Sequence, residues 1–206
     1  MQSDITNQRI IGLTGGIATG KSTVSDYLAT THHLPILDAD VYAREAVETG
    51  SPILQTLVQR YGDTILLGDS ALNRAQLGQI IFNQPTERHW VEQQIHPFVR
   101  QRFAQVRSQY PTSQPLVYAI PLLFEANLTH LVSEIWVVTC SLQQQLERLM
   151  ARNSLSQADA QARIDNQLPL TEKVAKADHV LDNSNDKGQL YQQVDQILED
   201  TGTTHS

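Results

Sequence analysis

The stretch that decides the fold is Gly15-Gly16-Ile17-Ala18-Thr19-Gly20-Lys21-Ser22, which matches Gly-x-x-x-x-Gly-Lys-Ser/Thr, the phosphate-binding loop (P-loop). Gly15 and Gly20 permit backbone angles that a Cβ disfavours, so successive amide N–H groups can turn around a phosphate. Lys21 supplies a positive charge for the β- and γ-phosphates, and the Ser22 hydroxyl is an oxygen ligand that suits Mg²⁺. The sequence therefore predicts a nucleotide site here. The other loop residues expected to contact ATP are Gly16, Ala18, Thr19 and Thr23.

The segments on either side of the loop support this prediction. Upstream, Arg9–Thr14 is a short apolar run with β-branched residues, typical of a buried strand. Downstream, Thr23–Ala29 places Val24, Tyr27 and Leu28 at helical spacing. A helix that starts near Gly20 adds its positive dipole end to the phosphate site. The alternative is a glycine turn with a solvated lysine, and the order strand, loop, helix favours the P-loop.

Length, composition and charge describe an ordinary globular protein. The chain has 206 residues, of which 40% are hydrophobic and 18% charged, which is enough for one domain or a core with insertions. The formal net charge of −7 argues against a general nucleic-acid binder. A nucleotide enzyme remains compatible with that charge, because its site needs only local positive potential.

The single cysteine and the lack of long apolar runs indicate a cytoplasmic protein. Cys140 closes the apolar run Ile135–Cys140, so a buried thiol in a reducing compartment is expected and an internal disulfide is excluded. The N-terminal stretch Met1–Arg9 has no apolar signal-peptide region. No run approaches the length of a membrane span, so no membrane partner is expected.

Four further apolar runs predict strands, and helical patterns separate them. The runs are Leu34–Leu37, Leu116–Ile120, Ile135–Thr139 and His179–Leu181. They scarcely alternate, as expected for strands buried on both faces of a parallel sheet. The alternation of strand and helix predicts a three-layer α/β domain with a five-stranded parallel sheet and right-handed crossovers. Ligands of such domains bind beyond the carboxyl ends of the strands.

Two intervals between strands are too long for one crossover helix. About eighty residues separate the second and third strands, and they contain three helical patterns: Pro52–Tyr61, Arg74–Phe82 and Thr86–Tyr110. We predict a helical insertion at 51–110, carried by a core at 1–50, 111–141 and 177–206. The second interval, 142–176, contains Arg148, Arg152, Arg163 and Lys173, and Ser156 is a helix N-cap candidate. A mobile basic segment here suits a lid over phosphates.

Two acids follow the second strand. Asp38 and Asp40 lie on one face if the strand continues, and are split if a helix starts at Asp40. Either one could accept a proton from an attacking hydroxyl or hold Mg²⁺ through water. The alternative is that one of them caps the next helix.

Other charged residues give weaker signals. Arg148 and Arg152 share a helix face and could clamp a transferring phosphoryl group, unless they form a solvated face beside Glu147. His96 is isolated before Pro97, and a lone histidine is more often structural. No Cys/His cluster has zinc-ligand spacing, and no Gly-x-Ser-x-Gly motif occurs.

The motifs that accompany the P-loop distinguish among the classes of enzyme that contain this loop. No Asn-Lys-x-Asp for guanine occurs, and no Asp-x-x-Gly follows the third strand, which argues against a regulatory GTPase. The small size, the two acids and the arginine-bearing interval favour a nucleotide or metabolite kinase.

An ordered set of motifs resembles the dephospho-CoA kinase family over nearly the whole chain. The matching segments are 13–17, 20–24, 38–40, 43–44, 95–97, 121–125, 148–152, 163–167 and 177–184. The resemblance implies transfer of the ATP γ-phosphate to the ribose 3′-hydroxyl of dephospho-CoA, the last step of coenzyme A synthesis. It also implies a nucleotide-kinase core, a helical CoA domain and a lid.

The resemblance further implies roles for individual residues. Asp40 matches the family's base, with Asp38 beside it, and Arg148 and Arg152 match its lid arginines. The segment Pro121–Glu125 lies near the acceptor in the family. Acceptor contacts are therefore expected from Arg44, His96, Leu122 and Glu125. Core packing for residues 122–124 and a structural role for Glu125 remain the alternatives. Two rival functions stay open. One is another P-loop nucleoside or metabolite kinase, and the other is a nucleotide-binding regulator without turnover.

Overall fold

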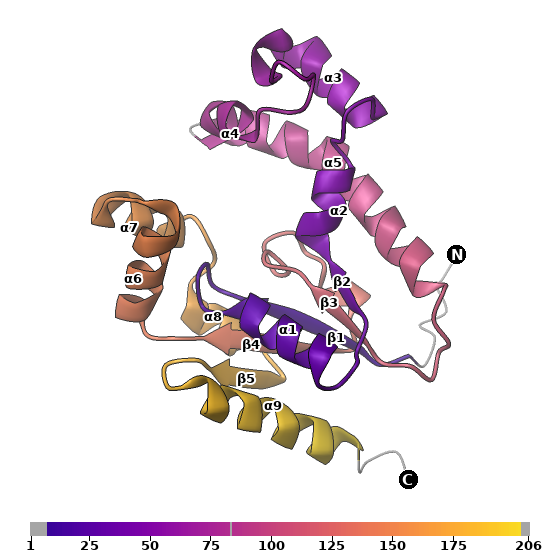
Figure 1. Ribbon diagram of the computed structural model, residues 1–206, viewed down its shortest axis with the longest axis vertical. Helices are drawn as coiled ribbons and strands as arrows, with labels where there is room; N and C mark the ends of the chain where they lie inside the picture. The colour runs from indigo at the N-terminus through magenta and orange to yellow at the C-terminus, as the bar shows by residue number, and fades with distance from the viewer. Residues whose placement is uncertain (1–7, 83, 203–206) are drawn as a thin grey trace. The chain divides into compact units, whose positions relative to one another are not determined.

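The computed structural model describes residues 8–82 and 84–202, so residues 1–7 of the stretch Met1–Arg9 lie outside it. Within the described residues, five strands form one sheet in the order β2-β3-β1-β4-β5 (Figure 1). The strands are β1 (Ile10–Gly15), β2 (Ile36–Asp38), β3 (Leu116–Ala119), β4 (Glu134–Thr139) and β5 (His179–Asp182). β1 pairs in parallel with β3 and β4, and β4 pairs in parallel with β5. The predicted parallel α/β sheet is confirmed.

Four of the five strands lie within one residue of their predicted bounds, and β2 differs more. The prediction began that strand at Leu34, whereas β2 begins at Ile36. His33 adopts a left-handed conformation (φ 53°), and the Leu34 N–H donates to the Leu28 carbonyl at 3.1 Å. These contacts close the turn after the preceding helix, so the extended chain starts only beyond it.

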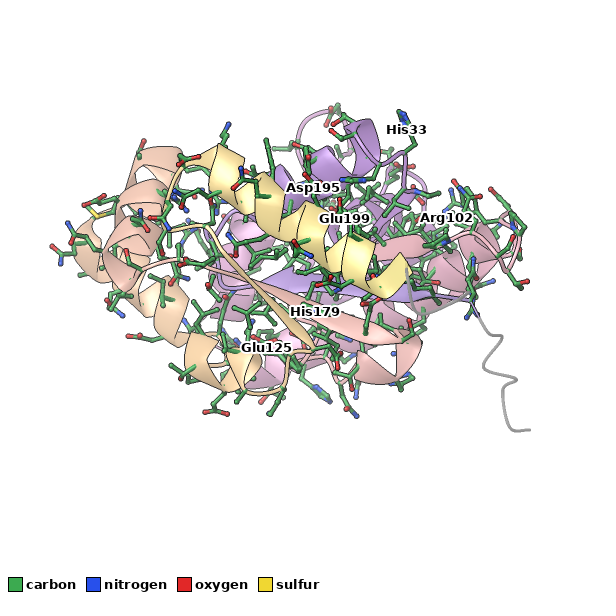
Figure 2. The ribbon with its side chains drawn as sticks, turned by 90° about the horizontal axis from the view of Figure 1, so that it is seen from below. His33, Arg102, Glu125, His179, Asp195 and Glu199 are labelled. Atoms are coloured by element: carbon green, nitrogen blue, oxygen red, sulfur yellow. The ribbon has the colours of Figure 1, made fainter. Side chains whose placement is uncertain are left out.

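The core on one face of the sheet is formed by two helices. Every residue of β1 is buried, as befits a central strand. Val24 and Leu28 of α1 (Lys21–Thr30) and Leu190 and Val194 of α9 (Lys187–Gly202) belong to the same buried cluster as residues of β1, β3, β4 and β5. Figure 1 shows α1 and α9 beside the strands, and Figure 2 shows α9, with Asp195 and Glu199, lying across them.

The interval between β4 and β5 is helical, as predicted. It contains α6 (Leu142–Asn153), α7 (Gln157–Asp165) and α8 (Leu170–Val174). Ser141 begins α6 with a capping box to Gln144, and Ser156 caps α7, because its hydroxyl accepts from the Asp159 N–H at 3.2 Å. Among the described helices, none is long and apolar enough to cross a membrane.

Contacts divide the chain into two compact units, and unit 2 is the continuous segment Asp38–Tyr110. Unit 1 comprises Met1–Leu37 and Pro111–Ser206. The helices of unit 2 are α2 (Ala39–Glu45), α3 (Pro52–Tyr61), the 3₁₀ turn η1 (Asp63–Ile65), α4 (Arg74–Phe82) and α5 (Pro85–Arg107). Its own hydrophobic cluster includes Leu54, Leu57, Ile65 and Val91. Because this cluster is separate, unit 2 has a core of its own.

Unit 2 begins thirteen residues before the insertion predicted at 51–110, because α2 packs on α5. The rings of Tyr42 and Phe103 meet edge to face with centroids 5.1 Å apart. Arg102 donates to Glu45 at 2.8 Å. The short helix α2 is therefore held by the long helix α5 at the other end of the segment.

A charged cluster links α3 to α5 within unit 2. Arg60 donates to both carboxylate oxygens of Glu87, at 2.7 and 2.8 Å, and the Tyr61 hydroxyl donates to it at 2.7 Å. These bonds, that of Arg60 above all, lower the pKa of Glu87 to about 2. Burial and the neighbouring carboxylate raise the pKa of Tyr61 to about 12. The Arg60 guanidinium also lies 4.4 Å from the centroid of the Trp90 ring.

Candidate nucleotide site

The P-loop connects β1, which ends at Gly15, to α1, which begins at Lys21. Gly20 is the N-cap of α1 and has φ 104°, a conformation that residues with a Cβ rarely adopt. Gly15 is required for a different reason than the predicted dihedral freedom. A Cβ on Gly15 would lie 2.6 Å from the Val138 carbonyl oxygen and 2.7 Å from the Thr19 hydroxyl. Its role is therefore to let β4 and the loop approach closely.

Two glutamines hold the middle of the loop at Ile17. The buried Gln145 of α6 donates from Nε2 to the Ile17 carbonyl at 2.7 Å. The Ile17 N–H donates to Oε1 of Gln167, in the segment before α8, at 2.8 Å. Both hydrogen-bonding groups of this residue are thus fixed by side chains from the interval 142–176.

The end of the loop is held at the Thr19 carbonyl. The buried Asn183, just after β5, donates to it from Nδ2 at 2.8 Å, and Arg148 donates to it at 3.5 Å. The Thr19 hydroxyl, itself buried, donates to the Gly16 carbonyl at 2.9 Å. Since these carbonyls face protein donors, the loop backbone is set before any phosphate binds.

These polar side chains were not predicted as site residues. Gln167 and Asn183 belong to segments that resemble the family, and Gln145 lies one turn before Leu149 on α6. The only signal in the sequence was that these side chains are polar. Their position beside the P-loop is revealed by the fold.

Arg148 and Arg152 lie on one face of α6 but in different surroundings. Arg148 also donates to the Asn183 carbonyl at 3.0 Å, so it does not belong to a solvated face. Its neighbour Glu147 accepts a hydrogen bond from Gln143 at 2.9 Å. Arg152 is exposed and donates to its neighbour Asn153 at 2.9 Å. Arg148 is therefore placed against the P-loop, and Arg152 is placed toward solvent.

Cys140 is buried, as predicted, between β4 and α6. Burial raises the pKa of its thiol, and the nearby Arg148 only partly opposes that rise. The thiol is therefore neutral and unreactive at pH 7.

Lys173, predicted as a basic group of the lid, is instead completely buried. Its ammonium forms an ion pair with Glu125 at 2.8 Å. Glu125, predicted near the acceptor, is therefore engaged within unit 1. Leu122 is exposed after β3, whereas the adjacent Leu123 belongs to the core.

The two acids of the second strand are separated by a helix start in unit 2. Asp38 caps α2, because its Oδ1 accepts from the Asp40 N–H at 2.7 Å and the Val41 N–H at 3.4 Å. Asp40 lies in the first turn of α2 and is exposed. The capping alternative therefore describes Asp38.

The remaining predicted contacts also lie in unit 2. Arg44 is exposed in the last turn of α2, and its carbonyl accepts from Arg74 at 3.5 Å. His96 lies half-buried on α5, and burial lowers its pKa, so it is neutral at pH 7.

No group of three or more His, Cys, Asp or Glu side chains within residues 8–82 and 84–202 could hold a metal ion. The exposed Ser22 hydroxyl, at the start of α1, is a hard oxygen donor. Mg²⁺ typically keeps several waters and takes few protein ligands when it binds with a nucleotide. The residues present therefore fit a Mg²⁺ that arrives with ATP.

A comparison with models of known protein families gives a match over most of the chain. The family model described as dephospho-CoA kinase matches residues 9–189. This chain belongs to the dephospho-CoA kinase family. The match includes both units and every part of the P-loop environment described above, so the predicted resemblance is confirmed.

Individual relatives agree with membership of the dephospho-CoA kinase family. The dephospho-CoA kinase of Trichormus variabilis is 61% identical over 191 residues, covering 93% of this chain and 97% of the relative. A crystal structure from Thermus thermophilus matches with a TM-score of 0.80 at 30% identity, covering 94% and 97% of the two chains. The dephospho-CoA kinase from Campylobacter jejuni matches with a TM-score of 0.70 at 25% identity, covering 96% and 98%.

Proposed function

We propose that the chain transfers the γ-phosphate of ATP to the ribose 3′-hydroxyl of dephospho-CoA, giving CoA and ADP. The observation that carries this proposal is the family match over residues 9–189, joined to a P-loop whose backbone is held in place. The phosphoryl group needs little covalent chemistry from the protein, so positioning and charge neutralisation supply most of the acceleration.

The P-loop holds the phosphates of ATP in this proposal. Lys21 neutralises charge on the β- and γ-phosphates, and the start of α1 directs its amides and dipole toward them. Ser22 is the residue that would ligate Mg²⁺, which when bound screens charge on the phosphate oxygens. Gly16, Ala18, Thr19, Gly20 and Thr23 complete the nucleotide contacts.

Asp40 acts as the base toward the acceptor hydroxyl. Its neighbour Asp38 already accepts two backbone N–H groups as the N-cap of α2, which supports the choice of Asp40. A carboxylate in this role orients the 3′-hydroxyl and takes its proton as the bond to phosphorus forms. Arg44, His96 and Leu122 are proposed to contact the acceptor.

The interval 142–176 acts as a lid, and its arginines stabilise charge during transfer. Arg148 lies close enough to the loop to donate to the Thr19 carbonyl, and Arg152 follows it one turn later on α6. Guanidinium groups suit phosphate oxygens because they can donate two parallel hydrogen bonds. Closure of the lid would exclude water that otherwise hydrolyses ATP.

The deciding experiment measures ADP release with dephospho-CoA and compares it with AMP, CMP and adenosine at equal concentrations. Strong preference for dephospho-CoA is expected, and a product with a 3′-phosphate should appear by mass spectrometry and NMR. Lys21→Ala is the matched control, and should lose at least a hundredfold in kcat while circular dichroism shows the fold unchanged. Preference for another acceptor would support a different P-loop kinase. ATP binding without ADP release for any acceptor would support a regulator.

A further inference from the structure

Lys173 of α8 is a completely buried lysine in unit 1. Lysine is almost never fully buried without a partner, because its ammonium loses the solvation of water. Its Nζ contacts Glu125 Oε1 at 2.8 Å and donates to the carbonyls of Gly15 at 3.4 Å and Pro121 at 3.5 Å. The ammonium therefore lies where three segments of the chain meet.

The contact with Gly15 concerns the first peptide of the P-loop. A trans peptide is planar, so the orientation of the Gly15 carbonyl also fixes the Gly16 N–H, which points the opposite way. The positive charge of Lys173 attracts the Gly15 carbonyl oxygen, which lies 3.4 Å from its Nζ. The direction of the first loop amide thus depends on a charge that no solvent reaches.

The other two contacts of Lys173, with Pro121 and Glu125, also connect it to the P-loop through further hydrogen bonds. The Pro121 carbonyl also accepts from the Thr14 hydroxyl, at 3.0 Å, one residue before the loop. Glu125 Oε1 also accepts from the Leu168 N–H at 3.0 Å. Leu168 follows Gln167, whose side chain accepts from the Ile17 N–H. Removing the ammonium would therefore loosen both the start and the middle of the P-loop.

We propose that Lys173 is a positioning residue for ATP, which sets the P-loop backbone from behind without touching the nucleotide. This inference rests on the proposed function, because it needs ATP in the loop. Its chemistry is electrostatic: one buried cation holds the Gly15 and Pro121 carbonyls and balances Glu125, whose side chain is 23% exposed. Small displacements of positioned groups have large effects on phosphoryl transfer.

The test compares Lys173→Met, which keeps the length of the side chain and removes its charge, with Lys176→Met. Lys176 is the matched control, since it is exposed and lies 5.8 Å from the centroid of the Phe124 ring. Calorimetric titration with ATP and Mg²⁺ should show at least a tenfold weaker Kd for Lys173→Met and less than a twofold change for Lys176→Met. The KM for ATP should rise in parallel, and Lys173→Arg should recover part of the affinity.

A second variant separates positioning from stability. Lys173→Met leaves Glu125 without its cation, so a lower Tm is expected. In Lys173→Met with Glu125→Gln the unpaired charge is gone and Tm should recover, whereas ATP affinity should stay low. Wild-type ATP affinity in Lys173→Met, or affinity that returns together with Tm in the double variant, would overturn the inference. A wild-type protein that binds no ATP would overturn the proposed function and this inference with it.

Discussion

Gly20→Ala tests how tightly the P-loop is held, and its cost can be worked out from two contacts. Gly20 has φ 104°, and a residue with a Cβ loses about 1–2 kcal/mol in a left-handed conformation. The added Cβ would lie 2.1 Å from Nδ2 of Asn183, so that side chain must move. Its 2.8 Å bond to the Thr19 carbonyl is then lost, which costs about 1 kcal/mol more.

The expected loss of unfolding free energy is about 2–3 kcal/mol, the sum of the two contributions. For a chain of this size, that lowers Tm by roughly 4–12 °C. Differential scanning calorimetry measures the shift, and ATP titration should show weaker binding, since the Thr19 carbonyl orients the next amide of the loop.

Two matched variants separate the contributions. Gly50→Ala has φ 85° but nothing within 4 Å of its Cβ, so it should show only the backbone cost. In an Asn183→Ala background the colliding atom is absent, and Gly20→Ala should cost about 1 kcal/mol less than in the wild type. Equal costs in both backgrounds would refute the argument that the collision with Asn183 matters.

Three further predictions concern the arginines, the acids and pH. Arg148→Ala should lower both kcat and Tm, because Arg148 donates to the Thr19 and Asn183 carbonyls. Arg152→Ala should lower kcat alone. Unchanged kcat in both variants would remove the two arginines from the mechanism. Asp40→Asn should reduce kcat far more than ATP affinity, while Asp38→Asn should be mild since asparagine caps helices equally well; the reverse pattern would exchange their roles. Glu87 has a pKa lowered from 4.5 to about 2, so it stabilises unit 2 above about pH 4.5, and this contribution is lost as the pH falls toward 2. Urea unfolding of Glu87→Gln should accordingly depend less on pH between 4.5 and 2, and an unchanged slope would contradict the ion-pair argument.

The fold was largely predictable because its signals are local. The apolar runs gave strand bounds within one residue for four strands, and the P-loop glycines and Lys21 fixed the junction between β1 and α1. The predicted helix 52–61 agrees with α3, since Ser51 caps it and Pro52 starts it. The start of unit 2 at Asp38 was missed because α2 is short, and only its packing on α5 assigns it there.

The P-loop motif of the candidate site could be read from the sequence. The side chains that hold the loop in place could not. The motif predicts which groups would face phosphate, such as Lys21, and that assignment stays a prediction. It did not identify Gln145, Gln167 and Asn183, because hydrogen bonds between residues far apart depend on the fold. The burial of Lys173 was missed for the same reason, since a lysine in a polar helical interval normally reaches solvent.

The packing of α2 on α5 has a consequence for the order of folding. β1 and β3 pair with Ile10 opposite Leu116, so the central sheet must join strands about a hundred residues apart. Closing a loop costs conformational entropy that grows with its length. Unit 2 lies within this loop, and the contact between Tyr42 and Phe103 draws its two ends together. We expect unit 2 to form early, so that the sheet nucleates across a much shorter effective connection.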